Sequence, residues 1–269
     1  MTETTPRRTL IDGHVHIHPG VDPGALLDAA AANMAAAARR LDLDEREGAL
    51  LLTESAGVDA FAALPGVKGD WRVGQTGEPV SLVARRTRDG ARLVIVAGRQ
   101  IVTAEGIEAH GVGLASAPPA GRPSAATLQE IEAEGASPVL PWGFGKWSGA
   151  RGRLVAELIE TGPRTLALSD SGVRMAGSAR PPLMAKAERA GRPVIAGTDP
   201  LPFKGSERRV GRFGFVADVE LGEERPFAVF ADWLRTLAAS PPLYGRLERP
   251  LAFVAAQIAM QARKRFGRS

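Results

Sequence analysis

The stretch IDGHVHIHPG, residues 11–20, ends the first apolar run of the chain and contains three of its four histidines. Residues 9–17, TLIDGHVHI, are predicted to form a strand. Side chains at positions i, i+2 and i+4 of a strand share one face, so His14, His16 and His18 are expected to point the same way. Pro19 favours an extended backbone at His18. The first strand is therefore predicted to end in a cluster of imidazoles.

Apolar runs and helical segments alternate along the chain after this strand. A helix is predicted at 22–40, where Asp22 suits the N-cap and Pro23 the first helical position. Further strands are predicted at 48–54, 106–114, 137–142, 164–170 and 192–200, and further helices at 56–64, 124–135, 148–161, 181–191, 225–239 and 249–265. Strands that alternate with helices imply a mainly parallel sheet. Because no Gly-rich nucleotide turn follows the first strand, the expected fold is a single α/β domain over residues 1–269, a TIM-like (β/α) barrel or a distorted seven-stranded form of it.

Residues 79–103 interrupt this alternation. The apolar runs SLVARRT and ARLVIVA flank Arg88-Asp89-Gly90, and Asp-Gly is a strong hairpin turn signal. We expect an antiparallel hairpin that lies outside the barrel wall as a flap.

Composition excludes several classes of protein. The 269 residues are 44% hydrophobic and include no cysteine, which excludes a disulfide scaffold, thiolate zinc sites and a cysteine nucleophile. The net charge is only +4, and a dedicated nucleic-acid protein usually has a denser basic and aromatic face, so nucleic acid is not the expected partner. Residues 1–10 lack the apolar region of a secretory signal, and no uncharged stretch reaches the ~20 residues that span a bilayer. We expect a cytoplasmic protein without a membrane partner; its oligomeric state is left open.

The histidines and a late aspartate are candidate metal ligands. Neutral imidazoles bind zinc, iron and manganese, and the His-x-His spacing lets two rings reach one ion. VIAGTDP places Asp199 at the end of the last predicted strand, at the carboxyl-terminal barrel face where reactive groups gather. There Asp199 would ligate the metal and accept a proton from water. The alternatives are histidines packed without an ion and a turn aspartate before Pro200.

Four more residues are weaker ligand candidates, each with a structural alternative. Glu54 ends the second strand but could cap the next helix. Glu108 and His110 alternate on one strand face, and His110 could equally be a packed core histidine. Asp170 has the right strand-end position, but it precedes Ser171-Gly172, where a turn or cap role is natural.

Two segments are candidate substrate-binding loops. In PWGFGKWSGARGR, residues 141–153, Trp142 could form a wall of the pocket and Lys146 could hold an anion, although the loop could instead plug the barrel mouth. The segment FKGSERRVGRFGF, residues 203–215, is basic and could grip phosphate or carboxylate or be a solvated loop. Together with Arg174, its candidate residues for an anionic substrate are Lys204, Arg208, Arg209 and Arg212.

The two ends of the predicted barrel resemble a known superfamily. IDGHVHIHPG is similar to the first-strand signature of the amidohydrolases, and VIAGTDPLPF resembles their last-strand segment. The neighbouring polymerase-and-histidinol-phosphatase family has a similar His-x-His start and a late Asp. The resemblance implies a divalent ion (zinc, manganese or iron) whose activated water attacks an amide, ester or phosphoester. Unlike the amidohydrolases, this chain has no histidine after His110, so it would hold one ion, use carboxylates, or have lost catalysis.

The expected function is a metal-dependent hydrolase of a small, anionic substrate. A non-catalytic binding or scaffold protein on a degenerate hydrolase barrel is the main alternative. A lyase or isomerase at the same site is a further one, because a metal and a carboxylate can also abstract a carbon-bound proton.

Overall fold

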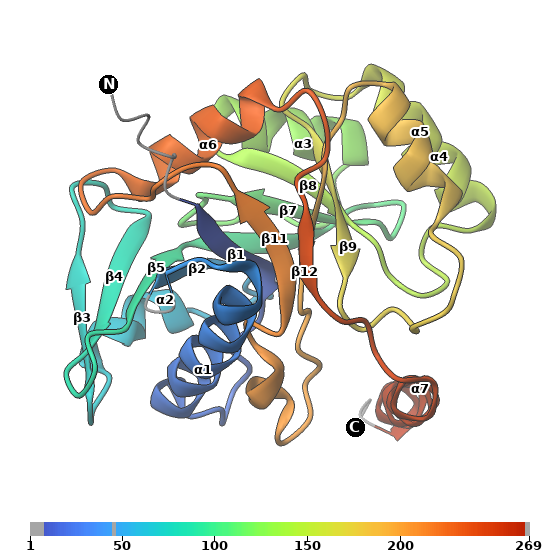
Figure 1. The fold of residues 1–269 in the computed structure, drawn as a ribbon. Helices are drawn as coiled ribbons and strands as arrows, with labels where there is room; N and C mark the ends of the chain where they lie inside the picture. The colour runs from blue at the N-terminus through green and yellow to red at the C-terminus, as the bar shows by residue number, and fades with distance from the viewer. Residues whose placement is uncertain (1–7, 45–46, 267–269) are drawn as a thin grey trace.

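The computed structural model describes residues 8–44 and 47–266; most of the N-terminal segment considered above, residues 1–7, lies outside them. The strands form two sheets (Figure 1). The seven-stranded sheet contains, in spatial order, β12 (Leu243–Gly245), β11 (Phe213–Ala217), β1 (Thr9–Val15), β2 (Glu47–Leu52), β5 (Arg92–Val96), β4 (Ser81–Arg86) and β3 (Trp71–Gln75). The five-stranded sheet contains β10 (Val194–Gly197), β9 (Ala167–Ser171), β8 (Ser137–Pro141), β7 (Glu108–Val112) and β6 (Gly98–Val102).

The predicted barrel is wrong, because the strands do not close into one sheet. In a barrel, the last parallel strand would pair with the free edge of β1. That edge instead pairs with β11, which runs antiparallel to β1 with Ile11 opposite Phe215. The four strands that the sequence did not signal, β3, β6, β11 and β12, all pair antiparallel. The fold is therefore a mixed α/β arrangement of two sheets.

The hairpin around Asp89-Gly90 is confirmed, but its position as an outer flap is wrong. β4 and β5 pair antiparallel, and Gly90 has the positive φ of 75° that the turn needs. The guanidinium of Arg86 donates two hydrogen bonds to the Asp89 carboxylate, at 2.9 and 2.7 Å. However, β5 also pairs in parallel with β2 and is buried along its whole length. The hairpin is thus an integral part of the larger sheet.

The described helices pack on the outer face of each sheet and against the core between the sheets, and the last one lies apart from both sheets (Figure 1). They are α1 (Pro23–Leu41), α2 (Ala60–Ala63), α3 (Ser124–Ala133), α4 (Gly149–Thr161), α5 (Pro182–Arg189), α6 (Pro226–Thr236) and α7 (Pro250–Phe266). As expected, Asp22 caps α1, accepting from the backbone N–H groups of Gly24 and Ala25, and Pro23 begins it. None of the helices in the described ranges combines the length and apolar character needed to cross a membrane.

Neighbouring residues of one strand supply different cores, because strand side chains alternate. Leu10 packs with α1 on the outer face of the seven-stranded sheet. Ile11 packs between the sheets, in a core that α6 joins through Phe227 and Phe230. A third core lies between the five-stranded sheet and helices α3, α4 and α5. Packing on both faces therefore holds the end of β1 in place, which fixes where His14 and the histidines that follow it lie.

The two sheets meet where β1 passes β10. Gly13 and Gly197 allow this approach: a Cβ on Gly13 would lie 2.7 Å from the carbonyl oxygen of Ala196, and one on Gly197 would lie 2.1 Å from the backbone nitrogen of His14. No side chain fits at those distances. Just beyond, the N–H of Asp199 donates to the carbonyl of His14 at 2.9 Å. This contact brings the ends of the two strands together.

Candidate functional site

The end of β1 is anchored by a buried carboxylate that the sequence analysis did not single out. Asp12 accepts hydrogen bonds from the Thr198 hydroxyl (2.6 Å), the Thr198 N–H (2.8 Å) and the Gly211 N–H (2.8 Å). Burial raises its pKa to about 6, although these hydrogen bonds act in the opposite direction. Asp12 thus joins β1 to the segment after β10. Its position two residues before His14 in the opening motif was the available signal.

Asp199 has an unusual backbone conformation. Its φ is 51°, in the left-handed region, whereas a residue before proline normally adopts an extended conformation. Such conformations cost free energy and persist where the surrounding structure imposes them. The side chain is held as well, because the Ser171 hydroxyl donates to Oδ2 of Asp199 at 2.8 Å. The backbone conformation of Asp199 and the hydrogen bond from Ser171 therefore both fix the orientation of its carboxylate.

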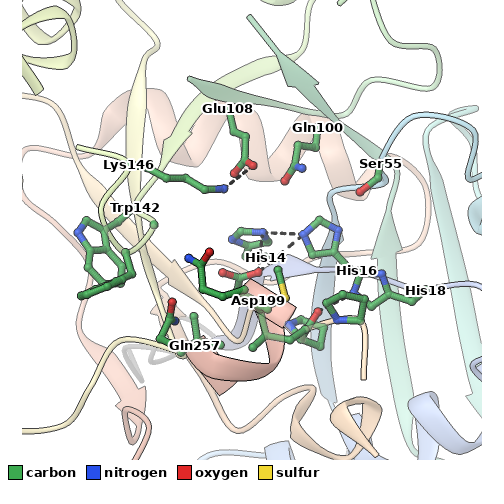
Figure 2. A pocket seen from close by; sticks show the side chains of 18 residues that line it. His14, His16, His18, Ser55, Gln100, Glu108, Trp142, Lys146, Asp199 and Gln257 are labelled. Carbon is green, nitrogen blue, oxygen red and sulfur yellow. Dashed lines mark hydrogen bonds and ion pairs between the residues drawn. The ribbon is translucent and has the colours of Figure 1, made fainter. Parts of the chain in front are cut away.

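Three ligand atoms converge at the meeting point of the strands (Figure 2). Nε2 of His14 lies 3.0 Å from Nε2 of His16. Oδ1 of Asp199 lies 3.4 Å from Nε2 of His14 and 3.8 Å from Nε2 of His16. In a tetrahedral site with bonds of 2.0–2.1 Å, two ligand atoms are about 3.3 Å apart. The observed separations lie around that value, so the three side chains fit a single small cation.

The protonation states also suit a metal. Burial lowers the pKa of both histidines, that of His16 to about 3, so their rings are neutral near pH 7. Burial opposes the charge of Asp199, but His14, His16, the Ser171 hydroxyl and Lys146 outweigh it, and the pKa of Asp199 lies below its ordinary value. Neutral imidazole and carboxylate are the forms that ligate metals. Among the described residues, these three are the group of histidines and carboxylates that could share an ion.

The three side chains line a pocket of about 280 Å³, which we call the histidine pocket. The Asp199 side chain is 18% exposed, whereas those of His14 and His16 are nearly buried. The three ligands are therefore accessible from the pocket on the side of Asp199. Gln257, Met260 and Gln261 of α7 also line this pocket. The loop after β8 contributes Trp142 and Lys146, and its Phe144 packs edge-to-face on Phe253 of α7, with ring centroids 5.2 Å apart.

Lys146 and Glu108 form an ion pair beside the candidate ligands (Figure 2). Glu108 begins β7, and Lys146 is on the loop after β8. Both line the histidine pocket, as does Gln100. Lys146 therefore lies where the sequence analysis expected an anion-binding group, but Glu108 contacts Lys146 and is not in the group of three ligand atoms.

The remaining histidines lie next to the site without joining the three ligands. His18 stacks on His16 and its Nε2 contacts the carbonyl oxygen of Pro200 at 2.7 Å. β1 ends at Val15, after its register with β2 shifts, so the shared face does not extend to His18. His110 packs edge-on against His14, with Nε2 3.3 Å from the amide oxygen of Gln100. It is fully buried, as the packed-histidine alternative expected.

Glu54 and Asp170 are engaged elsewhere. Glu54 accepts a hydrogen bond from the N–H of Phe61 at the start of α2, the capping role given as its alternative, and pairs with Arg99 at 3.0 Å. Asp170 is buried in a two-pronged ion pair with Arg174, at 2.9 and 2.7 Å. Neither carboxylate lines the histidine pocket. Arg174 is likewise directed at Asp170 and away from any substrate in that pocket.

The basic segment 203–215 does not reach the histidine pocket. Lys204 and Arg208 are exposed, and Lys204 lines a separate hollow beside His18. Arg209 forms an ion pair with Glu248. The expectation that Lys204, Arg208 and Arg209 bind the substrate at this site is therefore not met by their positions. The pocket residues that sequence reasoning missed, notably Gln257 and Gln261, belong to a distant helix that no local motif connects to the histidines.

The comparisons with known proteins bear on the fold alone. No family model matches the chain, and no curated protein matches it. Among solved structures, the crystal structure of PsfC from Pseudomonas syringae PB-5123 is similar, with a TM-score of 0.53 and 18% sequence identity over 95% of this chain and 99% of that one. At that identity the likeness shows a shared fold over nearly the whole length of both chains.

Proposed function

We propose that this chain is a metal-dependent hydrolase of a small, anionic substrate. The observation that carries the proposal is the convergence of two neutral imidazole nitrogens and one carboxylate oxygen, 3.0–3.8 Å apart, on an open pocket. Three protein ligands with a free position facing a pocket are typical of catalytic sites, whereas structural zinc sites use four protein ligands. The resemblance of the two strand-end motifs to the amidohydrolases agrees with this assignment.

His14, His16 and Asp199 would hold the ion, zinc, manganese or iron. A divalent ion there would polarise a carbonyl or phosphoryl oxygen and lower the pKa of water. Asp199 is the one carboxylate among the ligands and would accept the proton that water loses. Ser171 keeps Oδ2 of Asp199 hydrogen-bonded, so that Oδ1 faces the imidazoles and the carboxylate does not rotate.

The pocket also supplies groups for an anionic substrate. Lys146 has three N–H donors, so it can pair with Glu108 and still donate to a carboxylate or phosphate of the substrate. Gln100 and Gln257, which lie on either side of the ligand group (Figure 2), offer amide donors and acceptors. Trp142 provides an apolar wall. The substrate would be small, because a volume of about 280 Å³ lies at the lower limit of ordinary ligand pockets.

The test combines metal content with turnover. The protein as purified is analysed for metals, stripped with a chelator, reloaded with zinc, manganese or iron(II), and assayed on a panel of anionic amides, esters and phosphoesters. We expect one ion per chain, turnover that depends on it, and loss of both in the His14→Ala/His16→Ala double variant. Metal binding without turnover on any substrate class would instead indicate the binding-protein alternative.

A further inference from the structure

A second group of basic side chains lies outside the histidine pocket, in three hollows that share Arg212 and Arg246 as lining residues. The largest has a volume of about 400 Å³, and four of its seven lining residues are the arginines at 209, 212, 246 and 249. Arg40, near the end of α1, lines the next one, of about 250 Å³. We call the surface formed by these five arginines the arginine groove. It shares no lining residue with the histidine pocket.

The pairing of β11 with β12 brings the central arginines together. Phe213 pairs with Gly245 in an antiparallel register, so Arg212 and Arg246 occupy the next opposed positions, just beyond the ends of the two strands. A Cβ on Gly245 would lie 1.9 Å from the carbonyl oxygen of Arg212, which shows how closely the two chains approach. Like charges at opposed positions repel each other. The pairing of the two strands nevertheless keeps these two cations side by side.

The positive charge of the groove is largely uncompensated. Its one carboxylate, Glu248, is already paired with Arg209. Within the described part of the chain, the guanidinium groups of Arg212, Arg246 and Arg249 have no ion pair. Elsewhere on the described surface several arginines do have acidic partners, as Arg85 has Glu223 and Arg180 has Glu188. Three neighbouring cations without a counter-charge form a surface that a multivalent anion would stabilise.

We propose that the arginine groove binds a small molecule with at least two oxyanion groups, phosphates or carboxylates. A planar guanidinium group binds either a phosphate or a carboxylate through two parallel N–H···O hydrogen bonds. The hollow of about 400 Å³ has the size of an ordinary small-molecule site. Its lining contains no aromatic ring, and single-stranded nucleic acids are usually held by stacking on such rings. The site is therefore suited to a compact polyanion, and it does not depend on the proposed hydrolase activity.

Titration calorimetry with tripolyphosphate, and separately with citrate, tests the proposal. Both probes are added to the full chain after its metal has been stripped and the chelator dialysed away, because the groove needs no metal and a polycarboxylate chelator would itself compete for it. We expect one molecule of at least one probe to bind per chain, with a Kd tighter than about 1 mM in ~0.15 M salt, and the comparison identifies the preferred oxyanion. The Arg212→Ala/Arg246→Ala variant should weaken binding at least tenfold, while His14→Ala/His16→Ala should not change it.

The matched control is Arg72→Ala/Arg235→Ala, which removes the same two charges from exposed positions outside the groove. It should bind the probe within about twofold of the unsubstituted chain. Thermal melting of each variant verifies that it is folded, and the single variant Arg246→Ala replaces Arg212→Ala/Arg246→Ala if that double variant is not. Failure of both probes to bind, or an equal loss in the control, would overturn the proposal. So would tighter binding of a single-stranded oligonucleotide that the groove variant abolishes.

Discussion

Replacing Gly197 with alanine should separate the proposed metal ligands without altering any of them. The added Cβ would lie 2.1 Å from the backbone nitrogen of His14 and 2.6 Å from its Cβ. Carbon contacts are optimal at about 3.5–4.0 Å, so β1 and β10 must move apart by roughly 1 Å. Asp199 follows Gly197 by two residues, and metal bonds tolerate deviations of only ~0.2 Å. Zinc affinity is therefore expected to fall at least tenfold.

The same contact gives a stability cost of about 1–3 kcal/mol, typical of overpacking in a well-packed interior. Zinc affinity is measured by competition with a chromophoric chelator, and stability by urea unfolding of the metal-free protein. Gly74→Ala is the matched control, because Gly74 lies in a strand and no other group lies within 4 Å of the position that an added Cβ would take. It should leave the zinc affinity unchanged. A Gly197→Ala protein that is destabilised but binds zinc as tightly as the unsubstituted chain would refute the placement of Asp199 in the metal site.

Three more outcomes are expected from the site and its supports. Asp199→Asn should lower turnover by about 10²–10⁴-fold, the usual effect of losing a general base, and retain more bound metal than His14→Ala/His16→Ala; steady-state kinetics beside metal analysis measures both, and unchanged turnover would remove Asp199 from the chemistry. Chelation should lower the Tm, because an ion that binds only the folded chain stabilises it, and a Tm that is the same with and without chelator would contradict the site. Arg174→Met should destabilise the chain by about 3–5 kcal/mol by leaving the buried Asp170 carboxylate without its partner; urea unfolding tests this, and Asp170→Asn/Arg174→Met should recover part of the loss.

The sequence predicted most individual elements, because their signals are local. The helix after the histidines begins at Pro23 behind the Asp22 cap, as expected. The Asp89-Gly90 turn joins two antiparallel strands, again as expected. Both signals depend on a few neighbouring residues whose backbone preferences do not need the rest of the chain.

The strand partners could not be predicted in the same way. Alternating strands and helices indicated a barrel. The sequence of β11, FGFVA, is short, contains Gly214 and follows a run of basic residues, so its first half is indistinguishable from the end of the basic loop expected at 203–215. A strand's own sequence shows that it is buried, and does not show which strand lies next to it. The edge of β1 could be filled by β10 or β11, and only packing of the whole chain favours β11.

The candidate site divides along the same line. Local patterns were enough to identify the residues that could ligate a metal, because the His-x-His spacing and the strand-end position of Asp199 depend only on neighbouring residues. The packing of the sheets sets which of these candidates meet, because it fixes the distances between segments almost two hundred residues apart. This packing brings Asp199 within 3.4 Å of His14. It pairs Asp170 with Arg174, and it places Glu54 where it accepts a hydrogen bond from the start of α2. Arg209 lies in a separate groove. The partner of a carboxylate is the cation or N–H group that the fold packs against it, and the sequence around the carboxylate does not show which group that is.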